Sequence, residues 1–175
     1  LGSRDCDITS REAGFALFDR ERPDAVIHCA AYTAVDAAED NVDLCMKINR
    51  DGTENIAAVC EELGLKLMYI STDYVFSGEG DMPFETDSET KPCNYYGESK
   101  LDGEKAVIEN CKKHFIVRIS WVFGENGKNF VKTMLRLSKE REEITVVNDQ
   151  IGSPTYTKDL SKLLCDMIVT EKYGV

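Results

Sequence analysis

Apolar positions follow two alternating patterns along the chain, and together these predict strands and helices in turn. Short apolar runs predict buried strands over residues 25–29, 66–70, 115–119 and 144–147. Apolar residues at helical spacing predict helices over about 10–22, 42–63, 96–112, 129–141 and 157–170. Residues 73–94, rich in turn formers and acids, predict a long loop. This order indicates an α/β fold of the Rossmann-like, doubly wound type, with a parallel sheet covered on both faces.

Local signals mark several helix ends. Thr9-Ser10-Arg11-Glu12 matches a capping box and predicts the start of the first helix. Pro23 ends that helix, and Gly64 supplies the stop for the helix over 42–63.

Three polar segments follow predicted strands directly. They are Ala30-Ala31-Tyr32-Thr33, Ser71-Thr72-Asp73-Tyr74 and Ser120-Trp121. In parallel α/β sheets, ligands bind outside the carboxyl ends of the strands. We therefore expect these segments to meet at one edge of the sheet and to form a ligand site there.

A Tyr-x-x-x-Lys pattern, Tyr96 to Lys100, opens the predicted helix over 96–112. Residues four apart share a helix face, so the phenol and the ammonium point into one pocket. A nearby ammonium favours phenolate, so we expect Lys100 to lower the pKa of Tyr96. Such a tyrosine exchanges protons with an alcohol or a developing alkoxide, as carbonyl reduction by a nicotinamide requires. In isolation the pattern is also typical of a surface pair.

No glycine-rich turn follows any predicted strand, although dinucleotide-binding folds hold the pyrophosphate at such a turn. We therefore expect the first glycine-rich β-α-β unit and the C-terminal substrate lobe to be incomplete in this chain. Residues 1–147 are predicted to form a partial NAD(P)-binding domain. Residues 148–175 are predicted to begin the substrate-binding region.

Composition narrows the classes of partner. The net charge of −11 opposes binding to nucleic acid, and no apolar run approaches the about 18 residues of a membrane span. The seven cysteines form no CxxC pair, and Cys29, Cys45 and Cys60 fit small core positions. A reducing cytoplasm therefore suits the chain better than a disulfide framework. His28 and His114 lack the spacing of zinc ligands, so we expect no zinc site.

Four segments together resemble the dTDP-4-dehydrorhamnose reductase family of extended short-chain dehydrogenases. They are Cys29 to Asp36, the Ser-Thr-Asp-Tyr-Val-Phe segment at 71–76, the helix from Tyr96 through Leu101-Asp102-Gly103-Glu104, and Asn148 to Thr155. Asp5 to Thr9 resembles a further family stretch. The similarity keeps the family's order and spacing over nearly the whole chain, departing at Tyr32, where many relatives have histidine.

The resemblance implies NADH- or NADPH-dependent reduction of the C4 carbonyl of dTDP-4-dehydro-L-rhamnose to dTDP-L-rhamnose. It implies that Tyr96 is the general acid and that Lys100 also binds the nicotinamide ribose. Thr72 would hydrogen-bond the reacting oxygen; the alternative is that it caps the strand end. Asp73 would contact the substrate or brace the loop. Trp121 would pack against the substrate, although a lone tryptophan is more often a core residue.

The resemblance also assigns residues to the dinucleotide. Ala31, Tyr32 and Thr33 would line it, unless they only pack a helix over a strand. Asp7 and Ile8 would flank the adenine, and the Ile70 backbone would lie near the nicotinamide. The complete family member is further expected to use Mg²⁺ and to form a homodimer.

Two other functions stay open. The non-catalytic regulatory subunit of methionine adenosyltransferase resembles this family and keeps a similar Tyr-x-x-x-Lys helix, so the chain could be a binding partner rather than an enzyme. Trp121 and the segment Asp149 to Thr155 favour the reductase, because they resemble the substrate side of its site. A different nucleotide-sugar enzyme is the second alternative. A dehydratase would place Asp-Glu where this chain has Asp73-Tyr74, whereas an epimerase is harder to separate.

Overall fold

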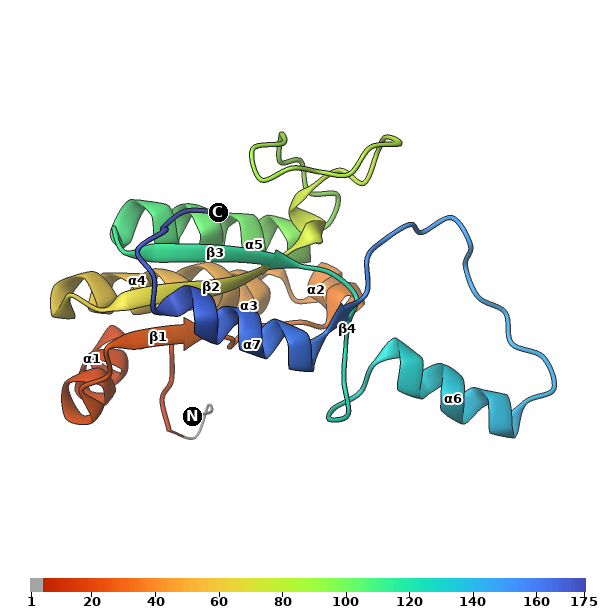
Figure 1. Ribbon diagram of the computed structural model, residues 1–175, viewed down its shortest axis with the longest axis horizontal. Coiled ribbons are helices and arrows are strands. Elements are labelled where there is room, and N and C mark those ends of the chain that lie inside the picture. The colour runs from red at the N-terminus through yellow and green to blue at the C-terminus, as the bar shows by residue number, and fades with distance from the viewer. Residues whose placement is uncertain (1–4) are drawn as a thin grey trace. The chain divides into compact units, whose positions relative to one another are not determined.

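The computed structural model describes residues 5–175, which form two compact units. The first unit contains the described residues through Arg118 together with Thr170–Val175, and the second is Ile119–Val169. Figure 1 shows the elements along the chain. The helices are α1 (Arg11–Glu21), α2 (Val35–Asp40), α3 (Val42–Met46), α4 (Gly52–Leu63), α5 (Tyr95–Asn110), α6 (Phe130–Glu140) and α7 (Thr157–Ile168). The strands are β1 (Ala25–His28), β2 (Lys66–Thr72), β3 (His114–Ile119), β4 (Val122–Phe123) and β5 (Thr155–Tyr156).

The sheet of the first unit has the order β1-β2-β3. β1 runs parallel to β2, with Ala25 opposite Lys66 and His28 opposite Tyr69. The last residues of the chain return to this sheet, where the Ile116 N–H donates to the Gly174 carbonyl oxygen at 2.8 Å. These strands confirm the alternating α/β prediction and the parallel pairing of β1 with β2.

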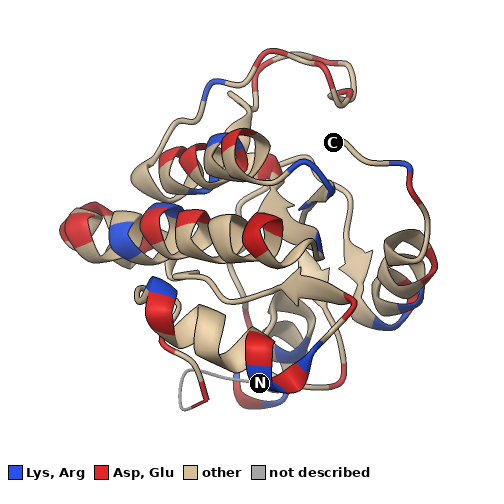
Figure 2. Cartoon of the chain, turned by 90° about the vertical axis from the view of Figure 1, so that its left-hand side faces the viewer, with Lys and Arg blue, Asp and Glu red and all other residues tan. Residues whose placement is uncertain are grey.

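Helices α4 and α5 pack beside each other and both contact β2, and α1 packs against α4. The core between them is apolar, as binary patterning predicts. Its buried members include Leu17, Ile56, Val59, Leu67, Tyr69, Val107 and Ile116. Figure 2 shows the acidic and basic residues along the helices and loops, whereas the strands carry few of them. The net negative charge thus sits mainly outside this core.

Helix caps set the entry and exit of several elements. α1 begins after Ser10, whose hydroxyl accepts from the Ala13 N–H, so the prediction of Thr9 as the cap was wrong by one residue. Thr9 bonds to Asp7 instead. Gly64 ends α4 in the left-handed region at φ 71°, which confirms the predicted stop.

The predicted helix over 42–63 is divided by a π-helical turn, η1 (Lys47–Asp51), between α3 and α4. Such turns add one residue to the helical repeat and often occur at functional sites. Periodicity could not reveal this turn, because the apolar positions on either side keep helical spacing. The short helix α2 before it was not predicted either.

The second unit pairs β4 with β5 in parallel, with Val122 opposite Thr155. The rings of Phe123 and Tyr156 stack across this pair at 5.3 Å. The predicted strand over 144–147 was wrong, because those residues have no regular structure and Val147 is 67% exposed. A short apolar run becomes a strand only when a neighbour supplies hydrogen bonds, and here β5 is the partner of β4.

Burial tests the expectation that three cysteines are small core residues. Cys45 and Cys60 are buried as predicted, but Cys29 is exposed, because it lies just past the end of β1. Within residues 5–175 no helix is long and apolar enough to cross a membrane. The functional division at residues 147/148 stays a prediction, and residues 1–4 of the predicted first domain lie outside the described part.

Candidate active site

The end of β2 carries the first part of the candidate site. Thr72 has extended backbone, and a 3-10 turn, η2 (Asp73–Val75), follows it. The Thr72 hydroxyl accepts from the Tyr74 N–H at 3.2 Å and donates to Asp73 Oδ1 at 3.1 Å. Thr72 therefore caps this turn, as the alternative interpretation expects, and the same hydroxyl also reaches Tyr96.

Helix α5 brings Tyr96 to this strand end. Its N-cap, Asn94, accepts from the Gly97 N–H at 2.8 Å. Gly97 lies so close to the Tyr74 carbonyl that a Cβ at this position would collide with it. The Tyr96 ring meets the Tyr74 ring edge-on, with centroids 5.6 Å apart. The first turn of α5 thus fits closely against η2, and only glycine permits this approach at residue 97.

Burial raises the pKa of Tyr96 above its usual value, the nearby Asp73 raises it further, and the hydrogen bond from Thr72 opposes the rise. The prediction that Lys100 lowers the pKa of Tyr96 was therefore wrong for this structure. The physical reason is that the Lys100 amine is directed to other partners: it bonds the Ile70 carbonyl oxygen at 2.8 Å and lies 4.0 Å from the centre of the Tyr69 ring. Tyr96 is accordingly a protonated phenol at neutral pH, the form that a proton donor needs.

Lys100 is 2% exposed, and this burial lowers its pKa to about 7. Glu104 and the thiols of Cys29 and Cys45 oppose the shift. The Ile70 carbonyl is the one hydrogen-bond acceptor recorded for the amine across residues 5–175. An ammonium has three donors, so Lys100 has donors to offer a ligand beside Ile70.

The segment after β1 is tied to α5 through Asn49 of η1. The Asn49 side chain is fully buried, accepts from the Tyr32 N–H at 2.7 Å and donates to the Tyr32 carbonyl oxygen at 3.0 Å. It also donates to the Ser99 hydroxyl at 2.9 Å, which in turn donates to the Tyr96 carbonyl oxygen at 2.7 Å. The predicted dinucleotide loop and the helix of Tyr96 are thus held by one amide.

Sequence reasoning missed Asn49, Ser99 and the buried acid Glu104. Each is a polar residue on the buried side of a helix, so it breaks the apolar pattern that marks a core. That break was the signal that could have identified them, since buried polar groups are retained with partners.

Asp7 and Ile8 lie before α1. Asp7 accepts two hydrogen bonds from Thr9, and these lower the pKa of its carboxyl. The Ile8 carbonyl oxygen accepts from the Asn55 side chain at 3.1 Å, and its side chain packs at Gly52, one residue after η1. Ile8 thus packs against the continuous helical segment that also carries Asn49. The roles of Asp7 and Ile8 in binding the adenine stay predictions.

Trp121 belongs to the second unit and is 44% exposed, so it is not a core residue. It has a left-handed backbone with φ 46°. Its ring lies 6.5 Å from the Phe130 ring, and a Cβ on Gly152 would approach the indole nitrogen to 2.8 Å. The second unit therefore joins Trp121 to the segment 148–155, the two parts predicted to face the substrate.

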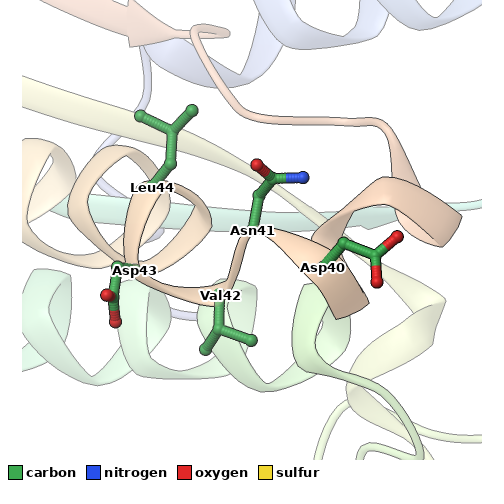
Figure 3. A pocket seen from close by; sticks show the side chains of 5 residues that line it. All are labelled: Asp40, Asn41, Val42, Asp43 and Leu44. Carbon is green, nitrogen blue, oxygen red and sulfur yellow. The ribbon is translucent and has the colours of Figure 1, made fainter.

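Neither the hollow found in the described residues nor their acidic, histidine and cysteine side chains supply a further ligand site. A shallow hollow is lined by one continuous stretch between α2 and α3, Asp40 to Leu44, and contains none of the predicted site residues (Figure 3). Within residues 5–175, no group of three or more His, Cys, Asp or Glu side chains could hold a metal ion. The magnesium expectation therefore has no support from these residues.

Comparison with known proteins agrees with this geometry. The family model described as RmlD substrate binding domain matches residues 1–174. A dTDP-4-dehydrorhamnose reductase of Escherichia coli (strain K12) is 53% identical over 152 residues, which cover 86% of this chain and 50% of that protein. A dTDP-4-keto-6-deoxy-D-glucose reductase of Streptomyces niveus is 39% identical over 172 residues, covering 98% of this chain and 60% of that protein.

Among solved structures, dTDP-4-dehydrorhamnose reductase from Bacillus anthracis str. Ames in complex with NADP superposes with a TM-score of 0.97 at 48% identity. That match covers 99% of this chain and 62% of the other. The chain thus spans about half to three-fifths of the length of these relatives. The matching family model and these relatives confirm the predicted resemblance, and the chain belongs to the dTDP-4-dehydrorhamnose reductase family.

Proposed function

We propose that the complete protein containing this chain is a reductase that converts a dTDP-4-dehydro-6-deoxy sugar, dTDP-4-dehydro-L-rhamnose first, to the corresponding alcohol. The observation that carries this proposal is the meeting of Thr72, Tyr96 and Lys100 at the carboxyl end of β2. The proposal is further supported by the names of relatives in Escherichia coli and Bacillus anthracis.

In this proposal the residues act on one oxygen atom. When bound, a reduced nicotinamide supplies hydride to the C4 carbon of the sugar. The Thr72 hydroxyl and the Tyr96 phenol hold the carbonyl oxygen, and Tyr96 gives it a proton as negative charge develops. The raised pKa of Tyr96 keeps the phenol protonated before the reaction, whereas Lys100, whose amine bonds the Ile70 carbonyl oxygen, acts on the bound dinucleotide.

The residues at the ends of β1 and β2 suit a dinucleotide. Small side chains at Cys29, Ala30 and Ala31 leave the end of β1 open to close approach, and Cys29 and Ala30 are exposed. The Lys100 amine has donors for ribose hydroxyls, next to the Ile70 carbonyl that it already contacts. We propose NADPH as the first cofactor to test, because the Bacillus anthracis relative was solved with NADP.

We propose that Asp73 of the first unit and Trp121 of the second unit each contact the substrate. An exposed indole in the second unit offers a flat apolar surface for a base or a sugar ring. Asp73 is partly exposed and borders the substrate, and the single O–H donor of Thr72, which points to Asp73 without substrate, turns to the carbonyl oxygen when the sugar binds. We also propose a cytoplasmic location and no nucleic-acid partner, in line with the odd cysteine count and the net charge of −11. The proposal of a homodimer rests on the family resemblance alone.

The Streptomyces niveus relative gives a specific second candidate substrate, dTDP-4-keto-6-deoxy-D-glucose. The complete protein would be supplied with each sugar and with NADPH or NADH, and oxidation of the nicotinamide would be followed by absorbance. Substrate-dependent oxidation with a dTDP-6-deoxyhexose as product supports the reductase, and the faster sugar identifies the substrate. A folded protein that oxidises neither cofactor with either sugar, yet binds a methionine adenosyltransferase catalytic subunit, contradicts it.

A further inference from the structure

Glu104 is a buried carboxylate that the proposed reaction does not use. It lies on α5, four residues after Lys100 and eight after Tyr96, and is 2% exposed. Its Oε1 accepts from the Ser71 hydroxyl at 2.5 Å. The guanidinium of Arg118, on β3, donates two hydrogen bonds to this carboxylate, from Nε to Oε1 at 3.0 Å and from Nη2 to Oε2 at 2.7 Å.

The hydrogen bond between Glu104 and Ser71 holds the end of β2 between two residues of the candidate site. Ser71 stands between Ile70, whose carbonyl oxygen holds the Lys100 amine at 2.8 Å, and Thr72, which reaches Tyr96. Glu104 therefore fixes this strand end against the helix that carries Tyr96 and Lys100.

Through Arg118, Glu104 also contacts the loop that follows β2. Arg118 Nη1 donates to the Thr86 carbonyl oxygen at 3.0 Å, and its guanidinium lies 4.9 Å from the centre of the Phe76 ring. Phe76 in turn stacks on Phe84 at 4.5 Å. The Arg118 guanidinium thus connects Glu104 to Phe76 and to Thr86, the two ends of the loop over 76–86.

Stability alone does not explain this arrangement. The two side chains are only 3% and 14% exposed, and the desolvation of such a pair can exceed its Coulomb attraction. A buried ion pair is weak support for stability, but its fork geometry fixes direction well.

We propose that Glu104 is a positioning residue for the Tyr96–Lys100 pair: through Ser71 it sets the end of β2, and through Arg118 it sets β3 and the loop over 76–86. This inference rests on the proposed function. Glu104 touches neither reacting atom and acts through the residues that do.

Several charged or titratable groups face the Lys100 amine. Glu104 lies on the same helix, Cys29 follows β1, Cys45 is on α3, and the Tyr69 ring of β2 lies under the amine. His28 at the end of β1 interacts with it as well. Among these, Glu104 is the largest influence that raises the pKa of Lys100, which burial lowers to about 7. Removal of its charge should therefore lower this pKa further, and Lys100 should lose its proton at a lower pH.

The test replaces Glu104 with glutamine in the complete protein. We expect kcat/KM for the sugar to fall about ten- to a hundredfold, because small misplacements of reacting groups have effects of this order. The alkaline limb of the pH profile should move to lower pH by about one pH unit. Glu109→Gln, which removes an exposed carboxylate from the same helix, is the control and should leave both quantities unchanged.

Ser71→Ala keeps the ion pair and provides a second variant if Glu104→Gln fails to fold. We expect a loss of about threefold to tenfold in kcat/KM, since one hydrogen bond is removed. Unchanged kcat/KM in Ser71→Ala, or an unmoved alkaline limb in folded Glu104→Gln, would overturn the proposal.

A titration of Lys100 by NMR, with its signal assigned through Lys100→Met, separates this inference from the proposed function. If the wild type turns over no sugar, the reductase proposal fails, and the titration still decides the role of Glu104. A pKa of Lys100 that falls in Glu104→Gln supports that role. An unchanged pKa contradicts it.

Discussion

Helices α5 and α6 both begin at an asparagine cap, but the helix with the clearer apolar stripe is the one that buries no residue. The two caps are Asn94 and Asn129. α5 buries seven residues, including Lys100 and Glu104, whereas α6 has a clear apolar stripe and no buried residue. Polar residues on the buried side of a helix therefore indicate a site more directly than amphipathic spacing does, because each of them must be held by partners.

The largest difference between the two helices should follow from removing a lysine. Lys100→Met should reduce kcat/KM of the complete protein about a hundredfold or more, since the amine proposed to hold the ribose hydroxyls of the cofactor is lost. Its stability should stay the same or rise, because burial disfavours the charged amine. Urea unfolding and steady-state kinetics measure both effects.

Lys132→Met on α6 is the matched control. Among residues 5–175, the Lys132 amine donates only to the backbone carbonyl oxygens of Glu125 and Gly127, both at the surface. We expect little change in kcat/KM. An equal loss of activity in both variants would contradict the special role of the buried lysine.

The next effect concerns the close fit of α5 to η2. Gly97→Ala should destabilise the protein by about 1–3 kcal/mol and lower kcat, because the new Cβ meets the Tyr74 carbonyl and displaces Tyr96. Thermal unfolding and kcat test this directly. On α6, Ser138→Ala changes an exposed position and should remain within about 0.5 kcal/mol of the wild type.

A pH-dependent effect follows from His28, which burial keeps neutral with a pKa lowered to about 4. Above pH 6.5 the imidazole is neutral in both the folded and the unfolded chain. As the pH falls from about 6.5 to 4, only the unfolded chain gains the proton, so unfolding free energy should fall by up to about 3 kcal/mol. Urea unfolding across this range measures the slope.

His28→Gln should remove that contribution, because glutamine does not titrate. His114→Gln is the control, and the slope should persist in it. The same pH dependence in wild type and His28→Gln would show that other groups produce the slope.

The smallest effects come from the two caps. Asn94→Ala and Asn129→Ala should each cost about 1 kcal/mol, because each removes a side-chain acceptor from the first turn, at 2.8 Å and 3.0 Å respectively. Only Asn94→Ala should also lower kcat, since Tyr96 is in the first turn of α5. Equal kcat values for the two variants would contradict the proposed link between this cap and the catalytic tyrosine.

Much of the fold could be predicted from local patterns. The strands β1, β2 and β3, the helices α1, α5, α6 and α7, and the stop at Gly64 follow from periodicity and turn chemistry. The predicted strand over 144–147 failed because strand formation depends on a partner that the run itself does not specify. The π turn at Lys47–Asp51 escaped prediction because it changes the helical repeat without changing the apolar spacing.

The candidate site shows the same division. The Tyr96–Lys100 motif and Thr72 are visible in the sequence, and the structure brings all three to one strand end. The pKa of Tyr96 was predicted with the wrong sign, because burial and the direction of the Lys100 amine come only from the folded structure. Asn49 and Glu104 connect elements far apart in the chain, and no local pattern specifies such partners.

The most direct measurement is kcat/KM for dTDP-4-dehydro-L-rhamnose in the complete protein, with Tyr96→Phe beside Tyr95→Phe. Tyr95 precedes Tyr96 in the same helix turn and is 42% exposed, so it is a matched control for the loss of a phenol. We predict a loss of about a hundredfold or more in Tyr96→Phe and near-normal turnover in Tyr95→Phe. Normal turnover in a folded Tyr96→Phe would contradict the assignment of Tyr96 as the proton donor.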